Sequence, residues 1–282
     1  MPELAYVNGE FVSIDRAVVS VEDRGFQFGD AVYEVIVAYN GKLFLPDEHM
    51  QRLRQSAAGI KLDYPFDQQP LVTIMQEGLR RSELGDAMIY VQLTRGAAPR
   101  NIVIPPGIQP TTVMTFRPRP IIPEETRRRG LCVLTVPDIR WANCSIKAVT
   151  LLPNMLARNE AARQGHDDAL FVTHDGHIRE CTASNIYVIK EGRVRTPRRT
   201  QAILHGVTQL FVMHCAQSLG IPLEECDIPL EALRSADEAF LSSTISEVLG
   251  ITAVDGKPIA DGKVGPLTHR LHEEFVRLAQ TA

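Results

Sequence analysis

The sequence predicts an α+β protein of two domains, and three observations support that prediction. The chain has 282 residues, enough for two hydrophobic cores. Short runs of β-branched and aromatic residues recur on either side of Asn-Gly and Asp-Gly pairs, the pattern of β-hairpins. A proline-rich stretch at residues 117–123 divides the chain. We therefore expect a small N-terminal domain over residues 1–117, a linker over 118–130 and a larger C-terminal domain over 131–282.

Composition and charge favour a small-molecule partner. Hydrophobic residues make up 44% of the chain and the formal charge is -4 at pH 7, which gives no electrostatic reason for binding nucleic acid or an anionic membrane. We find no secretion signal and no apolar span long enough to cross a bilayer. The five cysteines are scattered without a Cys-x-x-Cys pair, which argues against a disulfide framework and a zinc site. We predict a cytoplasmic protein without a metal.

The first half begins with two predicted hairpins, which turn at Asn8-Gly9 and Asn40-Gly41. Between them, Gly25 and Gly29 bracket an aromatic pair, and this bracket predicts a constrained loop. The expected strands lie at residues 4–7, 10–12, 32–39, 42–45, 88–93 and 112–116, and the expected helices begin at Pro46 and cover residues 71–82.

A long loop is expected between the last two of these strands, over residues 94–110. It contains Arg95, Arg100 and four prolines. Long ordered loops in compact domains are often functional.

The second half mixes hairpins with helices. Asp175-Gly176 and Glu191-Gly192 mark two further turns. We expect both halves to be built on hairpins and not on regular βαβ alternation. The expected strands are 131–136, 169–173, 177–180, 185–189, 193–196 and 238–241, and the expected helices are 150–164, 207–219, 230–235 and 266–279.

Lys147 is the residue whose setting suggests chemistry. It lies between strand-like residues 131–136 and helix-like residues 150–164, among apolar neighbours. Desolvation disfavours the ammonium form of lysine, and an uncharged amine can attack a carbonyl. Lys147 is therefore a candidate for Schiff-base chemistry, although a single lysine at a helix start is more often a snorkelling or ion-paired side chain.

A lysine that condenses with an aldehyde cofactor needs a cradle for the cofactor phosphate. The amides of Val207 and Thr208 open a helix, residues 242–244 supply consecutive hydroxyls, and Arg52 supplies a charged donor fork. Each feature alone is common in proteins without a phosphate site. Together they are candidates for the cradle.

Glu180 is the candidate partner for a cofactor ring nitrogen. It ends a strand-like run. A carboxylate beside a pyridine nitrogen keeps that nitrogen protonated, so the ring can stabilise a neighbouring carbanion. A single glutamate in this position is otherwise a solvated or ion-paired strand end.

A series of short motifs runs in order along almost the whole chain. They are EDRGFQFGD (22–30), YEV (33–35), EHMQRL (48–53), TRG (94–96), DIRW (138–141), IK (146–147), ExxxSN (180–185), ILxGxT (203–208) and STxSE (243–247). This set resembles the fold-type IV pyridoxal phosphate enzymes, that is, the class IV aminotransferase family. Within that family the chain is most similar to the D-amino-acid (D-alanine) aminotransferases.

The resemblance implies a cofactor and a role for each candidate. Lys147 would join covalently to pyridoxal 5′-phosphate and move a proton between the substrate Cα and the cofactor C4′. Glu180 would pair with the pyridine nitrogen. The phosphate would be held by Arg52, Val207, Thr208, Ser243 and Thr244.

The resemblance also implies substrates and an assembly. The amino donor would be a D-amino acid of the D-alanine or D-glutamate type, and the acceptor a 2-oxo acid such as 2-oxoglutarate or pyruvate. Members of this family form homodimers, so the resemblance implies a homodimer with its site at the subunit and domain interface. Tyr33 and Arg100 match positions that bind the substrate α-carboxylate, with Arg100 reaching in from the neighbouring subunit.

Two positions depart from the pattern of the bacterial D-alanine aminotransferases. Their loop reads Pro-Arg-x-His, whereas this chain has Ile102 in place of the histidine, and Val37 stands where relatives carry lysine or arginine. Each lost charge-assisted hydrogen bond is worth about 1.5–3 kcal/mol. We expect a more apolar, less exacting pocket in which Arg100, helped by Tyr33, dominates carboxylate recognition.

Several alternatives use the same machinery: a branched-chain L-amino-acid transaminase, an (R)-amine transaminase or an aminodeoxychorismate lyase. The loop around Arg100 favours a D-amino-acid enzyme. A non-catalytic protein with Lys147 and Glu180 ion-paired in its core is a further alternative. It is disfavoured because burying such a pair without a ligand is costly.

Overall fold

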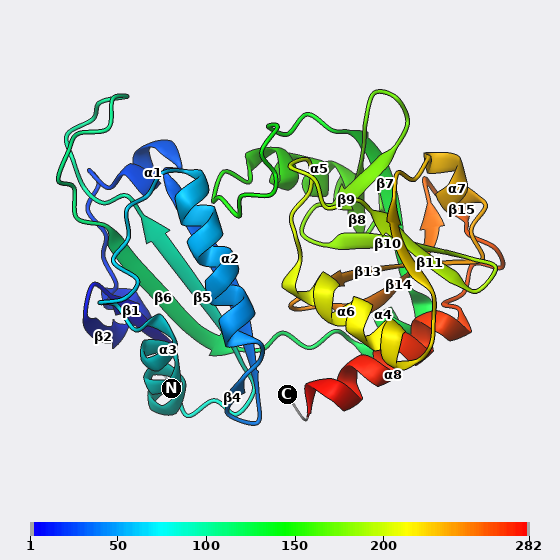
Figure 1. Ribbon diagram of the computed structural model, residues 1–282, viewed down its shortest axis with the longest axis horizontal. Helices are drawn as coiled ribbons and strands as arrows, with labels where there is room; N and C mark the ends of the chain where they lie inside the picture. Colours follow the sequence, from blue (N-terminus) through cyan, green and yellow to red (C-terminus); the bar gives the residue numbers. More distant parts are fainter. Residues whose placement is uncertain (1–2, 281–282) are drawn as a thin grey trace. The chain divides into compact units, whose positions relative to one another are not determined.

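The computed structural model describes residues 3–280 and divides by its internal contacts into two compact units (Figure 1). The first unit runs to Pro120 and includes the short segment Ile146–Thr150, and the second comprises Ile121–Ser145 and the chain from Leu151 onward. The segment that contains Lys147 therefore groups with the first unit, whereas the sequence placed it in the larger C-terminal domain. Its hydrogen bonds, described below, explain the difference.

A six-stranded antiparallel sheet forms the first unit, in the order β2-β1-β6-β5-β3-β4. Both predicted hairpins are confirmed, and their turns place Asn8 and Asn40 at φ 47° and 50°. The strands are β1 (Leu4–Val7), β2 (Glu10–Ser13), β3 (Ala31–Tyr39), β4 (Lys42–Leu43), β5 (Ala87–Thr94) and β6 (Thr111–Pro118).

Helices α2 (Pro46–Gly59) and α3 (Leu71–Ser82) pack on this sheet. Their apolar side chains, including Leu53 and Met75, meet Ile36, Ile89 and Phe116 in one buried cluster. The predicted loop at Gly25–Gly29 is instead a short helix, α1 (Arg24–Phe28), preceded by the 3-10 turn η1 (Ile14–Arg16). The Asp23 carboxylate accepts a hydrogen bond from the Gly25 amide at its start, and Gly29 ends it at φ 66°.

A nine-stranded sheet forms the second unit, in the order β12-β11-β10-β13-β14-β7-β8-β9, with β15 paired to β14. Its strands are β7 (Leu131–Pro137), β8 (Asp168–Val172), β9 (Ile178–Cys181), β10 (Asn185–Lys190), β11 (Arg193–Pro197), β12 (Leu223–Cys226), β13 (Glu238–Ser243), β14 (Glu247–Val254) and β15 (Lys257–Pro258). Its helices are α4 (Glu124–Arg129), α5 (Leu152–Arg163), α6 (Val207–Ser218), α7 (Leu230–Arg234) and α8 (Pro266–Ala279).

The expectation of hairpins without βαβ units is wrong for the second unit. Strands β7 and β8 are parallel and are joined through α5, so β7-α5-β8 is a βαβ crossover. Strand β7 also pairs in parallel with β14, and β11 with β12. The two central strands β7 and β14 are far apart in sequence, and this pairing has no local signal.

Within residues 3–280, no helix is both long enough and apolar enough to span a membrane.

Candidate active site

The backbone on both sides of Lys147 is fixed to the first unit. The Tyr33 amide donates a hydrogen bond to the Lys147 carbonyl oxygen at 3.0 Å, and the Lys147 amide donates to Ser56 Oγ at 3.1 Å. Two residues further on, the Val149 amide donates to the Ala31 carbonyl oxygen at 3.2 Å. The connection between β7 and α5 therefore leaves its own unit and lies against the start of β3.

Two glycines make room for this segment. A Cβ at Gly59 would lie 2.8 Å from Ile146 Cδ1, and one at Gly29 would lie 2.7 Å from Thr150 Cγ2. Gly29 also has a left-handed φ of 66°, which favours glycine. Small residues at both ends thus let the lysine segment approach α2 and β3 closely.

The Lys147 side chain faces an aromatic pair. Its Nζ lies 4.4 Å from the centre of the Tyr33 ring, and that ring stacks on Tyr90 with centroids 5.5 Å apart. The Tyr90 hydroxyl donates to Gln92 Oε1 at 2.7 Å, and burial raises its pKa well above its ordinary value. Because the face of an aromatic ring attracts the nitrogen of a lysine, the Tyr33 ring is a positioning contact for the Lys147 side chain.

Arg52, the predicted phosphate ligand of the first unit, is held by Glu34. Its Nε donates to Glu34 Oε1 at 2.7 Å and its Nη2 to Glu34 Oε2 at 2.8 Å. His49 Nδ1 lies 2.7 Å from Glu34 Oε2, and it carries the proton because an ionised carboxylate can only accept. Burial alone would raise the pKa of Glu34, but the charge and hydrogen bonds of Arg52, together with His49, lower it to about 2.

The predicted substrate-binding residues of the first unit lie partly on β3 and partly on the loop between β5 and β6. Tyr33 is beside Lys147, as described. Val37 is fully buried four residues further along β3, on the same side of the strand as Tyr33. Arg100 and Ile102 lie on the exposed loop between β5 and β6, where the Ile102 side chain is 83% exposed.

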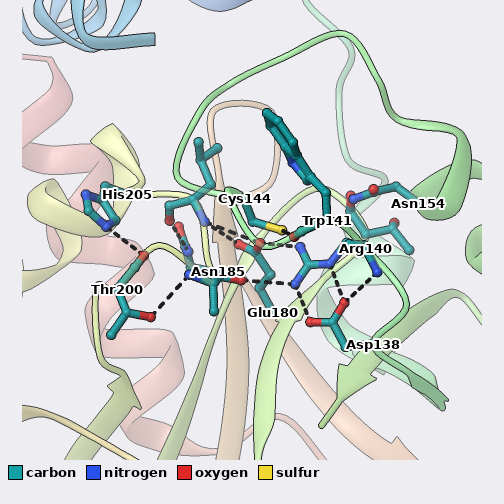
Figure 2. A network of polar contacts seen from close by, with 12 residues as sticks. Asp138, Arg140, Trp141, Cys144, Asn154, Glu180, Asn185, Thr200 and His205 are labelled. Atoms are coloured by element: carbon teal, nitrogen blue, oxygen red, sulfur yellow. Dashed lines mark hydrogen bonds and ion pairs between the residues drawn. The ribbon is translucent and has the colours of Figure 1, made fainter. Parts of the chain in front are cut away.

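Glu180, the predicted partner of the ring nitrogen, is the centre of a buried polar network in the second unit (Figure 2). Arg140 Nη1 donates to Glu180 Oε1 at 2.5 Å, and the Leu204 amide donates to Glu180 Oε2 at 3.1 Å. Asp138 accepts hydrogen bonds from Arg140 Nε at 2.9 Å and from Arg140 Nη2 at 2.8 Å. The centre of the Phe171 ring lies 4.2 Å from the guanidinium carbon of Arg140. Arg140 therefore positions the carboxylate of Glu180.

The hydrogen bonds and charges of this network do not fully offset the cost of burying an ionised Glu180 carboxylate. Burial raises the pKa of Glu180, and the opposing effects of Arg140 and the Leu204 amide do not bring it back to the ordinary value. Asp138 raises it slightly further. A cationic donor beside this carboxylate would stabilise its ionised form.

The predicted phosphate cradle of the second unit lies next to this network. Asn185 Nδ2 donates to the Leu204 carbonyl oxygen at 2.9 Å, so β10 is tied to the residues that precede α6. Gly206 is the N-cap of α6, and a Cβ there would lie 2.2 Å from Asn185 Oδ1. Because glycine has no side chain to cap the helix, the amides of Val207 and Thr208 are available to an anion.

The predicted hydroxyl residues of the cradle, residues 242–244, are held by strand pairing on one side and by a hydrogen-bonded turn on the other. Ser242, on β13, pairs in register with Asn185. At the end of β13, Ser243 Oγ accepts a hydrogen bond from the Ser246 amide in the turn that follows, at 3.0 Å. The turn ends at Glu247, which binds Arg127 at 2.8 Å and His272 at 3.0 Å. Asn185 begins β10 and contacts the residues before α6, and its partner Ser242 lies at the end of β13. The Ser243-Thr244 turn therefore lies at the same end of the sheet as the start of α6.

Comparison with known proteins assigns the family. The family model of amino-transferase class IV matches residues 31–254. The chain belongs to the class IV aminotransferases. It is 41% identical to the D-alanine aminotransferase of Listeria monocytogenes serotype 1/2a (strain 10403S) over 274 residues, which cover 96% of this chain and 94% of the relative. It is 37% identical to the D-alanine aminotransferase of Staphylococcus aureus (strain MSSA476) over 281 residues, 99% of both chains.

Solved structures of class IV aminotransferases share the fold. The branched-chain amino acid aminotransferase of Escherichia coli matches with a TM-score of 0.91 and 27% identity, over 99% of this chain and 94% of that one. A branched-chain amino acid aminotransferase from T.th., solved with pyridoxamine 5′-phosphate, matches with a TM-score of 0.92 and 25% identity, over 100% and 95%. The predicted α+β, fold-type IV architecture is confirmed.

Class IV aminotransferases use pyridoxal 5′-phosphate, and the residues of this chain fit that group. Glu180 is a buried carboxylate that a cationic donor would stabilise, which suits a protonated pyridine nitrogen. No side chain caps the start of α6 at Gly206, so the amides of Val207 and Thr208 suit a phosphate.

The structure also shows residues of this class IV aminotransferase to which the sequence assigned no role. Arg140 was part of the DIRW motif, and Glu34 was part of YEV, but neither had a function attached. Glu34 could have been found from its strand, since it alternates in phase with the buried Val32, Ile36 and Ala38. A buried glutamate on the apolar face of a strand needs cationic partners, and α2 offers them.

Proposed function

We propose that this class IV aminotransferase is a D-amino-acid transaminase. It transfers the amino group of a donor of the D-alanine or D-glutamate type to a 2-oxo acid such as 2-oxoglutarate or pyruvate, with pyridoxal 5′-phosphate as cofactor. The observation that carries the proposal is the identity of 37–41% to D-alanine aminotransferases over nearly the whole chain. The structure supports it with a positioned lysine, a buried carboxylate and an open helix start.

Lys147 is the proposed base. When bound, the cofactor supplies an aldehyde that takes up the amino group and a ring that withdraws electrons from the substrate Cα. The Nζ of Lys147 takes the proton from that carbon. The Tyr33 ring at 4.4 Å favours the ammonium that results, by about 0.5–2 kcal/mol. The hydrogen bonds to Tyr33 and Ser56 keep the lysine backbone from moving during this transfer.

Glu180 is the proposed partner of the pyridine nitrogen, and Arg140 is its positioning residue. The carboxylate would accept a hydrogen bond from the protonated nitrogen, and this would keep the ring electron-poor. Arg140 and the Leu204 amide fix the direction of that carboxylate. The phosphate is held, in the proposed arrangement, by Arg52, Val207, Thr208, Ser243 and Thr244.

Arg100 and Tyr33 are the proposed ligands of the substrate α-carboxylate. We propose a homodimer in which Arg100 serves the site of the neighbouring subunit, and a site that draws on both domains. Because Val37 and Ile102 replace polar groups, we propose that the pocket is more apolar than in the D-alanine aminotransferases, with Arg100 dominating recognition. The free thiols of all five cysteines support a cytoplasmic location.

A chiral substrate screen tests the proposed function. Purified holoenzyme is assayed with paired D- and L-amino acids and 2-oxoglutarate as acceptor, or pyruvate as acceptor where the donor is glutamate, and the 2-oxo acid and amino acid products are measured. We expect turnover of D-alanine and D-glutamate-type donors. Turnover of L-leucine without D-amino-acid turnover would instead identify a branched-chain transaminase, and turnover of simple (R)-amines alone would identify an amine transaminase.

The role of Lys147 has its own test. Lys147→Ala removes the base, so we expect kcat to fall by on the order of 10³-fold or more. Borohydride reduction of the unmodified holoenzyme followed by peptide mapping should place a pyridoxyl group on Lys147. Lys190→Ala is the matched control, because that lysine binds Ser235 and Asp237 and has no role in the proposed site. Near-normal turnover in Lys147→Ala would disprove the assignment.

A further inference from the structure

Apart from Gly29, which makes room for the lysine segment, the residues between Glu22 and Asp30 have no part in the function described so far. It forms α1 and the turns on each side, and it lies against the loop that carries Arg100. The Arg24 amide donates to the Gly96 carbonyl oxygen at 2.9 Å, and the Ala98 amide donates to the Glu22 carbonyl oxygen at 3.1 Å. The first residues of the loop are therefore bound to this segment by main-chain hydrogen bonds.

Arg24 extends this attachment to the residue next to Arg100. Its side chain is 4% exposed, and its Nη1 donates to the Asn101 carbonyl oxygen at 2.6 Å. The other edge of Arg24 donates from Nε to Asp30 Oδ2 at 2.9 Å. Asp30 is in turn held by Arg95 through bonds of 2.8 and 2.9 Å, so Arg24 has a rigid support.

Phe28 contacts both arginines. The guanidinium carbon of Arg24 lies 4.7 Å from the centre of the Phe28 ring, and that of Arg100 lies 4.5 Å from the same centre. The Arg100 Nη1 also lies 3.5 Å from the Gln27 carbonyl oxygen, at the C-terminal turn of α1. Two guanidinium groups that would otherwise repel each other are thus both attracted to one ring.

We propose that Arg24 and Phe28 are positioning residues for Arg100. Arg24 fixes the loop backbone at Asn101, and Phe28 fixes the guanidinium of Arg100, so the loop has its substrate-binding form before the substrate arrives. This inference rests on the proposed function, because it takes Arg100 as the carboxylate ligand. It adds what orders the loop and which residues set its affinity.

The expected effect is on substrate affinity and not on the chemical step. A loop that must be ordered during binding costs affinity, whereas a preordered loop does not. Arg24→Lys keeps the positive charge beside Asp30 but cannot reach both Asp30 and Asn101. We expect it to raise KM for D-amino acids on the order of tenfold, with kcat changed less than about threefold. Phe28→Leu, which keeps an apolar side chain, should raise KM severalfold.

A double-mutant cycle separates positioning from general damage. In an Arg100→Ala background, Arg24→Lys should no longer raise KM for D-amino acids, because there is no guanidinium left to position. Arg81→Lys is the matched control, since Arg81 also lies 4.5 Å from the centre of a phenylalanine ring, that of Phe11, outside the loop. We expect wild-type kinetics from this control.

The possible results are distinct. The positioning role is overturned if Arg24→Lys and Phe28→Leu raise KM by the same factor with and without Arg100. It is also overturned if both substitutions leave KM unchanged while Arg100→Ala raises it. If Arg100→Ala itself leaves KM unchanged while D-amino acids are still turned over, the proposed carboxylate role of Arg100 fails and not the activity.

Discussion

Glu34 in the first unit and Glu180 in the second are both buried glutamates paired with an arginine, yet their environments differ. Glu34 receives two hydrogen bonds from Arg52 and one from His49, and these lower its pKa to about 2 despite burial. Glu180 shares Arg140 with Asp138, and burial raises its pKa. A carboxylate whose partners outweigh its burial is a structural anchor, whereas one whose partners do not is prepared for a further cationic ligand.

The largest expected effect of this difference is on catalysis. Glu180→Gln should lower kcat on the order of 10²–10³-fold, because an amide does not keep a pyridine nitrogen protonated. Glu34→Gln should change kcat less than about threefold at saturating cofactor, since Glu34 acts only through Arg52. Steady-state rates with a D-amino acid and 2-oxoglutarate measure both. Equal losses of kcat in the two variants would contradict the distinction.

Stability should respond in the opposite order. Glu34→Gln leaves Arg52 buried beside an amide, and the pKa of about 2 for Glu34 corresponds to about 3 kcal/mol of lost unfolding free energy. Glu180→Gln should cost less than about 1 kcal/mol in the cofactor-free protein, because Arg140 keeps Asp138 as its partner. Urea unfolding of the cofactor-free variants at neutral pH measures this contrast.

The two glutamates should also give opposite pH profiles. The lowered pKa of Glu34 gives stability that is present above its ordinary value of 4.5 and is lost as the pH falls toward 2. The raised pKa of Glu180 gives the reverse, a contribution present below 4.5 and lost as the pH rises through its folded-state pKa. The measurement is the unfolding free energy of cofactor-free protein in urea titrations at several pH values. We expect the unfolding free energy of wild type minus that of Glu34→Gln to rise with pH. The corresponding difference between wild type and Glu180→Gln should fall with pH.

The smallest expected effect concerns His49, which supports Glu34 with a single hydrogen bond. Burial lowers the pKa of His49, so it is neutral at neutral pH. His49→Gln keeps a donor of similar reach, so we expect a loss of less than about 1 kcal/mol of unfolding free energy and unchanged kcat. A loss as large as that of Glu34→Gln would show that His49, and not Arg52, stabilises the carboxylate.

Local patterns in the sequence were sufficient for much of the fold. The Asn8-Gly9 and Asn40-Gly41 hairpins were predicted because the turn chemistry is local, and α3 and α8 match their predicted bounds because their apolar residues repeat at helical spacing. The parallel pairing of β7 with β14 was missed because the sequence analysis predicted no strand at β14 and because no short connection joins the two strands. Helix α4 was missed because Pro123, read as part of a linker, is its N-cap.

The sequence suggested candidate residues for the site but not the residues that hold those candidates in place. Lys147 and Glu180 stood out through residue type and motif spacing. The pairing of Glu34 with Arg52 depends on how α2 packs on β3, and that of Glu180 with Arg140 on the path of the chain after β7. Neither packing is encoded in a local pattern, so the residues that tune the candidates became visible only in three dimensions.

The excursion of residues Ile146–Thr150 has a consequence for dissection of the protein. A fragment that ends at Pro120 lacks the segment that lies against Ala31, Tyr33 and Ser56, and a fragment that begins at Ile121 carries that segment without its acceptors and donors. Neither polypeptide is a complete module. Splitting the gene at the proline-rich stretch should therefore yield pieces that need each other, and co-expression of both halves is the way to recover an ordered lysine.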